Sequence, residues 1–192
     1  TEKAGNLNLG IPGIMYMGGV SGLIAAFFYE RAAGDRASGL VGLLVSLCAA
    51  LLVSMLAGLL YSFLTVTLRA NQNVVGLSLT TFGVGFGNFF GGSLSQLAGG
   101  VGQISTKLTA AAYRQSLPGL SGLPFVGKAF FSFGFLTYLS IALSLCLAFL
   151  LTGTRKGLEI RAVGEDPAAA DAAGVDVNRV KYVSPVVGAA LA

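Results

Sequence analysis

The sequence contains no histidine, and only 10% of its 192 residues are charged. Soluble globular domains carry about 25% charged residues, so this composition excludes a soluble domain and indicates a membrane protein. No nucleophile paired with a base, no cluster of metal ligands and no phosphate-binding loop occurs in the sequence. The two cysteines, Cys48 and Cys146, lie in apolar runs, where we expect small packing residues. We therefore predict no catalytic residue and no metal in this chain, which is not expected to be an enzyme.

Long runs without charge alternate with short charged segments. Residues 4–29, 37–68, 70–106 and 129–154 contain no Asp, Glu, Lys or Arg, and a further apolar run begins near Tyr182. A membrane-spanning helix needs about 20 mostly apolar residues. The pattern predicts an all-α polytopic membrane protein, a multi-span helix bundle in a single transmembrane domain. The expected spans are about 7–29, 39–67, 74–98, 129–153 and 181–192, of which the last is incomplete.

Half of the charged residues lie between Arg155 and Lys181. Acidic and basic residues alternate there, so no continuous phosphate-binding stripe is present and we expect no nucleic-acid partner. If 154–180 is a cytoplasmic loop, one crossing per span leaves 99–128 as an external loop. The inside then carries slightly more Lys and Arg than the outside, as the positive-inside rule requires. The Pro-Gly motif Leu117–Pro124 breaks any helix in the external loop, which we expect to lie against the outer membrane face or a partner.

Glycines recur at four-residue spacing in two of the expected spans. Gly18 and Gly22 form one such pair, and Gly83, Gly87 and Gly91 extend the same spacing over two turns. This spacing places small residues on one helix face, where neighbouring backbones approach closely. We expect tight packing within the bundle, and a dimerisation face is the alternative.

Two short polar segments lie in or between the apolar runs. In Ala4–Gly13, two amides, three glycines and a proline make a continuous helix unfavourable, and non-helical backbone at membrane depth requires polar partners or a water-filled cavity. The pattern predicts a broken helix near a solute pathway; an interfacial entry with ordinary caps is the alternative. Three successive amides at Asn71–Asn73 could bind a polar uncharged solute, or form a short cytoplasmic turn. The candidate pathway residues are Asn6, Asn8, Gly10, Pro12, Asn71, Gln72 and Asn73.

The charged loop contains the signals of a short helix. Asp166 is a favourable N-cap, Pro167 suits the first helical position, and Gly174 can end the helix in a left-handed conformation. A helix of about two turns is marginal alone in water. We expect it to persist by docking its alanine face into a cleft of a soluble partner, or by leaning on its own membrane domain. The candidate coupling residues are Glu165, Asp166, Pro167, Ala168, Ala169, Asp171, Ala172 and Gly174.

Four motifs carry a resemblance to a known family. Thr154–Leu158 followed by Arg161–Arg179 resembles the cytoplasmic coupling segment of permease subunits from bacterial ATP-binding-cassette (ABC) importers, in the branch that serves ribose, other simple sugars and nucleosides. Glu2–Met15 resembles the broken-helix opening of that branch, and Leu68–Gln72 resembles its next internal turn. Leu120–Gly127 resembles the external loop of nucleoside-type members. The chain differs from those members at Asn6, Pro12 and Asn73, so the solute is left open between nucleosides and simple sugars.

The resemblance implies that the solute pathway and ATP binding belong to different subunits of one complex. Two permease subunits, the same or related, form the solute pathway in the bacterial cytoplasmic (inner) membrane. A separate cytoplasmic ATP-binding subunit holds ATP and Mg, receives the short helix after Asp166 and drives rocking of the spans. An extracytoplasmic solute-binding protein delivers the solute. No cofactor is expected in this chain, and we expect it to be a piece of a longer permease with further spans before Thr1 and after Ala192.

Other classes of transport protein give weaker explanations of the same residues. A permease for branched-chain amino acids is the alternative within ABC importers. A secondary transporter would usually need ionisable residues within its spans, and the expected spans contain no Asp, Glu, Lys or Arg except Lys181, at the edge of the last one. A channel bundle is compatible with the composition but does not explain the capped cytoplasmic helix.

Overall fold

The computed structural model describes residues 1–34, 37–97, 106–114 and 134–192. Every regular element in these ranges is helical, and no strand occurs among them, so the predicted all-α bundle is confirmed. In chain order, the elements are η1 (Glu2–Ala4), α1 (Ile11–Ala33), α2 (Gly39–Ser62), η3 (Phe63–Thr67), α3 (Gln72–Leu97), α4 (Lys107–Arg114), α6 (Phe135–Gly153), α7 (Arg155–Glu165), α8 (Pro167–Ala172) and α9 (Val177–Ala190). η1 is a 3-10 turn, and η3 is a π-helical turn that continues α2.

Among the described residues, four helical segments are long and apolar enough to cross a membrane: Ile11–Ala33, Gly39–Thr67, Gln72–Ser93 and Leu136–Gly153. The bounds of α1 differ from the expected span 7–29. Its helix begins after the polar residues because Pro12 fits the first turn, where no backbone donor is required. α9 begins before the expected position 181 because the Asp176 side chain caps its first turn and accepts from the backbone N–H of Arg179 at 2.9 Å.

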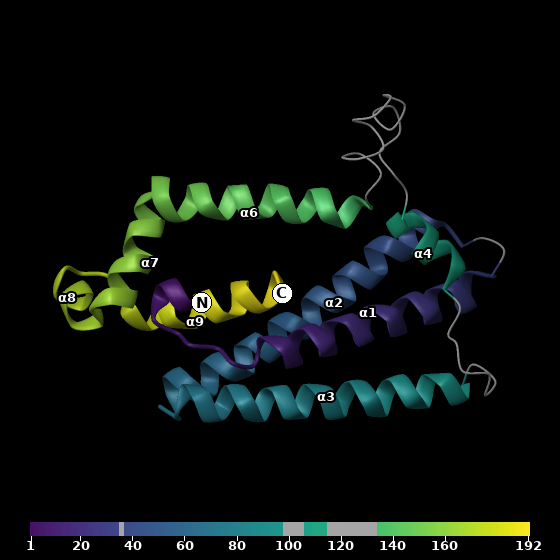
Figure 1. The fold of residues 1–192 in the computed structure, drawn as a ribbon, viewed down its shortest axis with the longest axis horizontal. Helices are drawn as coiled ribbons and strands as arrows, with labels where there is room; N and C mark the ends of the chain where they lie inside the picture. Colours follow the sequence, from purple (N-terminus) through teal and green to yellow (C-terminus); the bar gives the residue numbers. More distant parts are fainter. Residues whose placement is uncertain (35–36, 98–105, 115–133) are drawn as a thin grey trace, which may run out of the picture.

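The packed core consists of α1 with α2 and α3 on its two sides, and α9 packs against α2 (Figure 1). Gly18 and Gly22 of α1 are buried against α2, and Gly83 and Gly87 of α3 are buried against α1. The close packing predicted from the glycine spacing is therefore confirmed at these four residues. Gly91, the fifth, has open space around it.

α6 lies apart from this core. Its main contacts are with α7 and α4 near its two ends (Figure 1). None of its membrane-length window is buried, against 33% for α1. The sequence shows α6 to be apolar on all sides, so its exposed faces are suited to lipid or to other apolar helices.

The expected external loop 99–128 contains a helix, α4, which packs on α2. The carboxylate Oε1 of Glu30, at the end of α1, accepts from the backbone N–H of Thr109 at 2.8 Å and from its hydroxyl at 2.7 Å. The loop prediction overlooked this helix because the helix-breaking prolines lie beyond its last residue, Arg114. The motifs Leu117–Pro124 and Leu120–Gly127 lie outside the described residues.

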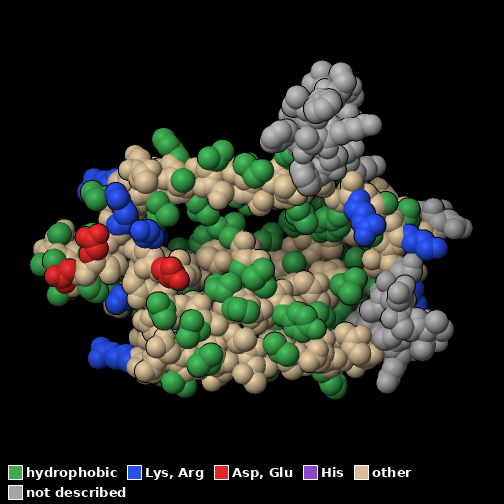
Figure 2. Space-filling view, in the orientation of Figure 1, with side chains coloured by type: hydrophobic (Ala, Val, Ile, Leu, Met, Phe, Trp, Pro, Cys, Tyr) green, Lys and Arg blue, Asp and Glu red, His purple; other side chains and the backbone are tan. Residues whose placement is uncertain are grey.

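Charged side chains gather toward the two ends of the molecule on the face seen in Figure 2, and its middle carries none. The end that includes α4 presents Lys and Arg, whereas the end that includes α7 and α8 presents both signs of charge (Figures 1 and 2). This distribution is typical of an apolar helix bundle whose two ends are exposed to water.

Candidate functional site

The coupling segment, residues 154–180, contains two helices and the start of a third. The Thr154 hydroxyl caps α7 by accepting from the backbone N–H of Gly157 at 3.1 Å. Gly157 is buried against the backbone of Leu150 and Leu151, which lets α7 turn away from the end of α6 (Figure 1). α7 was not predicted from the sequence because its mixed charges give little apolar periodicity, although Thr154 was a local signal for its start.

α8 has the caps predicted for it. The Asp166 carboxylate Oδ1 accepts from the backbone N–H groups of Ala168 at 2.9 Å and Ala169 at 3.1 Å. Pro167 occupies the first turn, and Gly174 adopts a φ of +84° just beyond the helix. The helix rests on Ala170, which is 4% exposed. The other predicted coupling residues, including Glu165, Asp171 and Ala172, are exposed, so α8 presents a small, accessible face at one tip of the molecule (Figure 1).

Residues 1–10, which we call the entry segment, precede α1 and are non-helical beyond the short η1 turn, whereas a broken helix near a solute pathway stays a prediction. After η1, Gly5 adopts a φ of +74° and the backbone continues outside any helix to Gly10. Side chains of the core supply its polar partners: the Tyr61 hydroxyl donates to the Leu7 carbonyl at 2.8 Å, and the Thr80 hydroxyl donates to the Leu9 carbonyl at 2.8 Å. Core side chains thereby satisfy two carbonyl groups of this non-helical backbone, as an apolar environment requires.

Asn6 has a specific partner in α9. Its side chain is 1% exposed, and its Nδ2 donates to the Lys181 carbonyl at 3.0 Å. That carbonyl would ordinarily accept from the backbone N–H four residues later, but residue 185 is a buried proline and has no N–H. Asn6 therefore supplies the hydrogen bond that Pro185 removes.

The other predicted pathway residues have different surroundings. The Asn71 Oδ1 caps α3 by accepting from the backbone N–H of Asn73 at 3.0 Å, as expected of a turn. The Gln72 Oε1 accepts from the backbone N–H of Leu7 at 2.9 Å, which brings the two polar segments, Ala4–Gly13 and Asn71–Asn73, together.

Asn8 has one satisfied and one unsatisfied side-chain atom. Its Oδ1 accepts from the Gly10 N–H at 2.8 Å, while its buried Nδ2 has no partner among the described atoms. Pro12 and Asn73 are exposed. Asn6, Asn8 and Gln72 thus lie in or beside the entry segment, and their contact with solute stays a prediction.

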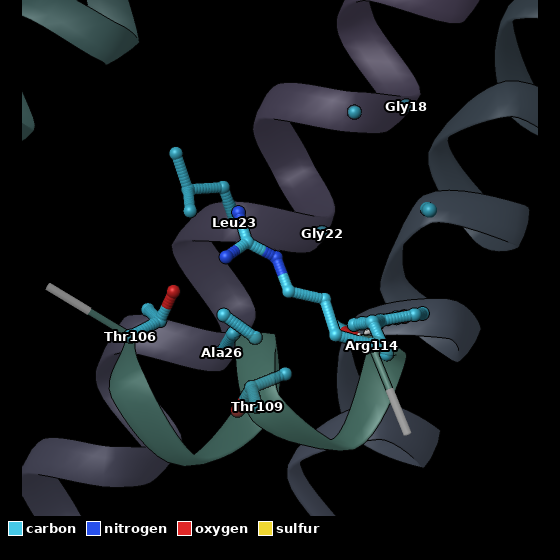
Figure 3. A pocket seen from close by; sticks show the side chains of 12 residues that line it. Gly18, Gly22, Leu23, Ala26, Thr106, Thr109 and Arg114 are labelled. Carbon is cyan, nitrogen blue, oxygen red and sulfur yellow. Dashed lines mark hydrogen bonds between the residues drawn. The ribbon is translucent and has the colours of Figure 1, made fainter. Parts of the chain in front are cut away.

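A cavity of about 380 Å³ lies at the end of the bundle that carries α4. Figure 3 shows Gly18, Gly22 and Leu23 on one side of it, Thr109 on α4, and the Arg114 side chain extending across it. None of the predicted pathway residues lines this cavity. The small residues of α1 were a signal in the sequence for this cavity. The side of the cavity formed by α4 could not be predicted, because it depends on contacts between distant parts of the chain, such as the hydrogen bond of 2.6 Å between the Ser46 and Tyr113 hydroxyls.

Comparison with known families gives a match over the whole chain. The family described as "Branched-chain amino acid transport system / permease component" matches residues 1–192. The guanosine ABC transporter permease protein NupQ of Bacillus subtilis is 32% identical over 188 residues, which cover 97% of this chain and 56% of that protein.

Two other relatives are similar. The putative glucose ABC transporter permease protein TsgC13 of Haloferax volcanii is 32% identical over 194 residues, covering 100% of this chain and 53% of the relative. The nucleoside ABC transporter permease protein NupC of Lactococcus lactis is 31% identical over 192 residues, covering 100% and 57%. The chain spans about half the length of these relatives. No solved structure matches it.

Proposed function

The chain belongs to the family of branched-chain amino acid transport system permease components, and from that premise we propose that it forms part of the membrane-spanning subunit of an ATP-driven importer for nucleosides or simple sugars. Its family and the four apolar helices in the part of the chain that the structure describes make it part of a multi-pass membrane protein. The proposed location is the bacterial cytoplasmic (inner) membrane. The similarity to ABC permeases named for guanosine, nucleosides and glucose supports this solute class.

The observation that carries the proposal is α8. A two-turn helix with a cap at Asp166 and exposed alanines suits insertion into a groove of a cytoplasmic ATPase subunit, which would bind ATP and Mg. The ATPase closes on ATP, and the docked helix passes that movement to the bundle. A second permease subunit, the same or related, would complete the solute pathway, and an extracytoplasmic solute-binding protein would deliver the solute.

The chemistry of the entry segment favours an uncharged solute. Asn8 keeps an amide donor without a partner among the described atoms, and amides donate to and accept from hydroxyl and carbonyl groups. An amino acid carries two charges, whose transfer from water into an apolar bundle is costly without charged partners. Residues 4–29 and 70–106 contain no charged side chain to provide them, and the neighbouring charged residues Glu2, Lys3, Glu30 and Arg69 lie outside these apolar runs. These residues therefore favour sugars and nucleosides over the branched-chain amino acids of the family's description.

The solute class can be tested with the full-length permease, reconstituted in liposomes with its ATPase and solute-binding protein. Uptake of radiolabelled nucleosides, pentoses, hexoses and branched-chain amino acids is measured with and without ATP. We expect ATP-dependent uptake of a nucleoside or a sugar. Uptake of amino acids alone would reject the solute class, and ATP hydrolysis unaffected by every solute would reject the importer.

Docking of α8 can be tested with Ala169→Arg. The side chain at residue 169 is exposed, so a large charged replacement fits the isolated permease but obstructs a close-fitting groove. We expect the variant to reach the membrane in normal amount and to lose both ATPase copurification and uptake. Ala169→Ser, which keeps a small side chain, is the matched control. Normal ATPase copurification and uptake with Ala169→Arg would contradict the docking role.

A further inference from the structure

The entry segment lies between the coupling segment and the core. On one side, η1 packs against α7, where Gly5 and Gly164 approach closely: a Cβ atom on Gly5 would lie 3.4 Å from the Gly164 Cα. A Cβ atom on Gly164 would clash with the Lys3 carbonyl oxygen. The next contact on the same side is the hydrogen bond from Asn6 to Lys181 of α9. The entry segment therefore touches the helices before and after α8.

On its other side, the entry segment is hydrogen-bonded to the core. Leu7 donates to Gln72 and accepts from Tyr61, and Leu9 accepts from Thr80. Two of these three partners belong to α3. The backbone of α3 also comes close at Gly76, where a Cβ atom would lie 2.8 Å from the Leu9 nitrogen. The turns within residues 1–10 are hydrogen-bonded internally, but Leu7 and Leu9 have partners in the core, and these partners hold the segment against α2 and α3.

The two long helices joined to the coupling segment, α6 and α9, have their main contacts with elements other than α3. α6 is joined to α7 but has its main contacts with α7 and α4, and its membrane-length window is 0% buried. α9 packs mainly on α2. Coupling between distant sites is carried by contiguous packing and hydrogen bonds. The entry segment joins both α7 and α9 to α3 by hydrogen bonds and close packing. A second route leaves α9 alone at Tyr182, which is hydrogen-bonded to Ser62 of α2 and to Thr67 of η3, and η3 in turn contacts α3.

We propose that the entry segment transmits movement of the coupling segment to α3, with Gly164 and Asn6 as positioning residues. The proposal rests on the proposed function, since it assigns the path by which ATPase closure reaches the helix that carries Gln72. When α7 and α9 shift, the close Gly5–Gly164 contact and the Asn6–Lys181 hydrogen bond move residues 3–6. The hydrogen bonds of Leu7 and Leu9 then carry this shift to α3.

The first test is Gly164→Ala in the full-length permease, reconstituted with its ATPase and solute-binding protein. The new methyl group pushes the entry segment away from α7, while α8 and its exposed face stay unchanged. We expect ATPase copurification and ATP hydrolysis to persist, with uptake per ATP hydrolysed falling by about fivefold or more, the lower end of usual coupling effects. Gly85→Ala is the matched control because a Cβ atom there meets nothing within 4 Å.

A second test separates transmission from simple stability. Asn6→Ala leaves the Lys181 carbonyl without a donor, and adding Pro185→Ala returns a backbone N–H that can satisfy it within α9. We expect the double variant to regain most of the thermal stability that Asn6→Ala loses, while uptake per ATP stays low. Recovery of uptake per ATP to the wild-type value in the double variant would overturn the transmission role of Asn6.

The outcomes distinguish this proposal from the proposed function. If the wild-type complex shows no ATP-driven uptake, the importer itself is rejected. If the wild type transports and both Gly164→Ala and Asn6→Ala keep the wild-type ratio of solute to ATP, the entry segment is not the path. Loss of ATPase copurification in both variants would also overturn the proposal, because the segment would then support the docking surface itself.

Discussion

At the scale of single residues, the start of α8 depends on Asp166. Its carboxylate accepts from two backbone N–H groups, and a helix of this length is marginal without such support. Replacing an N-cap by alanine costs about 1 kcal/mol, and 1 kcal/mol changes a population about fivefold. We predict that Asp166→Ala loosens α8 and lowers ATPase copurification by about that factor, as measured by pull-down from solubilised membranes.

The control for this cap is Asp166→Asn, which keeps an oxygen that can accept the same hydrogen bonds. We expect it to bind the ATPase nearly as well as the wild type. Equal ATPase binding by Asp166→Ala and the wild type would show that the cap is unimportant for docking. Equal losses in Asp166→Ala and Asp166→Asn would indicate that the negative charge, not the cap, contacts the partner.

Glu30 has a comparable role at the opposite end of the bundle. It accepts both the backbone N–H and the hydroxyl of Thr109, which is 3% exposed. Leaving a buried donor unsatisfied costs about 1–3 kcal/mol. We therefore predict that Glu30→Ala releases α4 and accelerates hydrogen exchange of residues 107–114, measured by mass spectrometry on the full-length protein. Arg31→Ala, which removes an exposed neighbour, is expected to leave exchange unchanged, and unchanged exchange in Glu30→Ala would refute the anchoring role.

These residues also show what a sequence can and cannot predict. The cap at Asp166 and the left-handed turn at Gly174 depend on residues a few positions away, so both could be predicted. Asn71 was ambiguous between a turn and a solute site, and the structure shows it capping α3. The partner of Asn6 lies 175 residues away in the chain, so only the fold reveals it.

At the scale of elements, the crossing of α1 and α3 requires two facing glycines. A Cβ atom on Gly13 would lie 2.6 Å from the Leu79 carbonyl oxygen, and Gly83 is packed against the backbone of Gly13. Overpacking a tight contact costs about 1–3 kcal/mol. We predict that Gly13→Leu separates the two helices and lowers the thermal unfolding temperature of the purified permease.

The matched control for the crossing is Gly85→Leu, also in a helix, where a Cβ atom has no neighbour within 4 Å. We expect a much smaller change in unfolding temperature for this variant. A similar fall in both variants would mean that the loss of glycine, not the crossing, is responsible.

The elements themselves differ in how far the sequence predicts them. The long uncharged runs predicted helices at α1, α2, α3 and α6, because length and apolarity are sufficient signals for such segments. α4 was missed because eight residues with mixed polarity do not stand out from a loop. The path of the entry segment between α7, α9 and α3 was missed because it depends on how these elements pack, and hydropathy carries no information about their order in space.

At the scale of the whole molecule, the two charged ends of the bundle differ in their features. The end with α8 carries the proposed docking face, and the end with α4 carries exposed basic residues such as Arg31 and Lys107. The small excess of basic residues inside is a weak signal, whereas docking of α8 on an ATPase requires that end to be cytoplasmic. Orientation of the bundle therefore follows from the proposed function more than from charge counting.

This orientation predicts opposite labelling of two engineered cysteines. Cys48 and Cys146 are exposed in the structure and are first replaced by alanine to remove background labelling. In the full-length protein in intact spheroplasts, a membrane-impermeant maleimide should label Arg31→Cys at once, because that position lies at the end expected outside. Arg155→Cys, whose native side chain is 93% exposed, should react only after the membrane is permeabilised. Immediate labelling of Arg155→Cys with protection of Arg31→Cys would reverse the orientation, and with it the docking of α8 on a cytoplasmic ATPase.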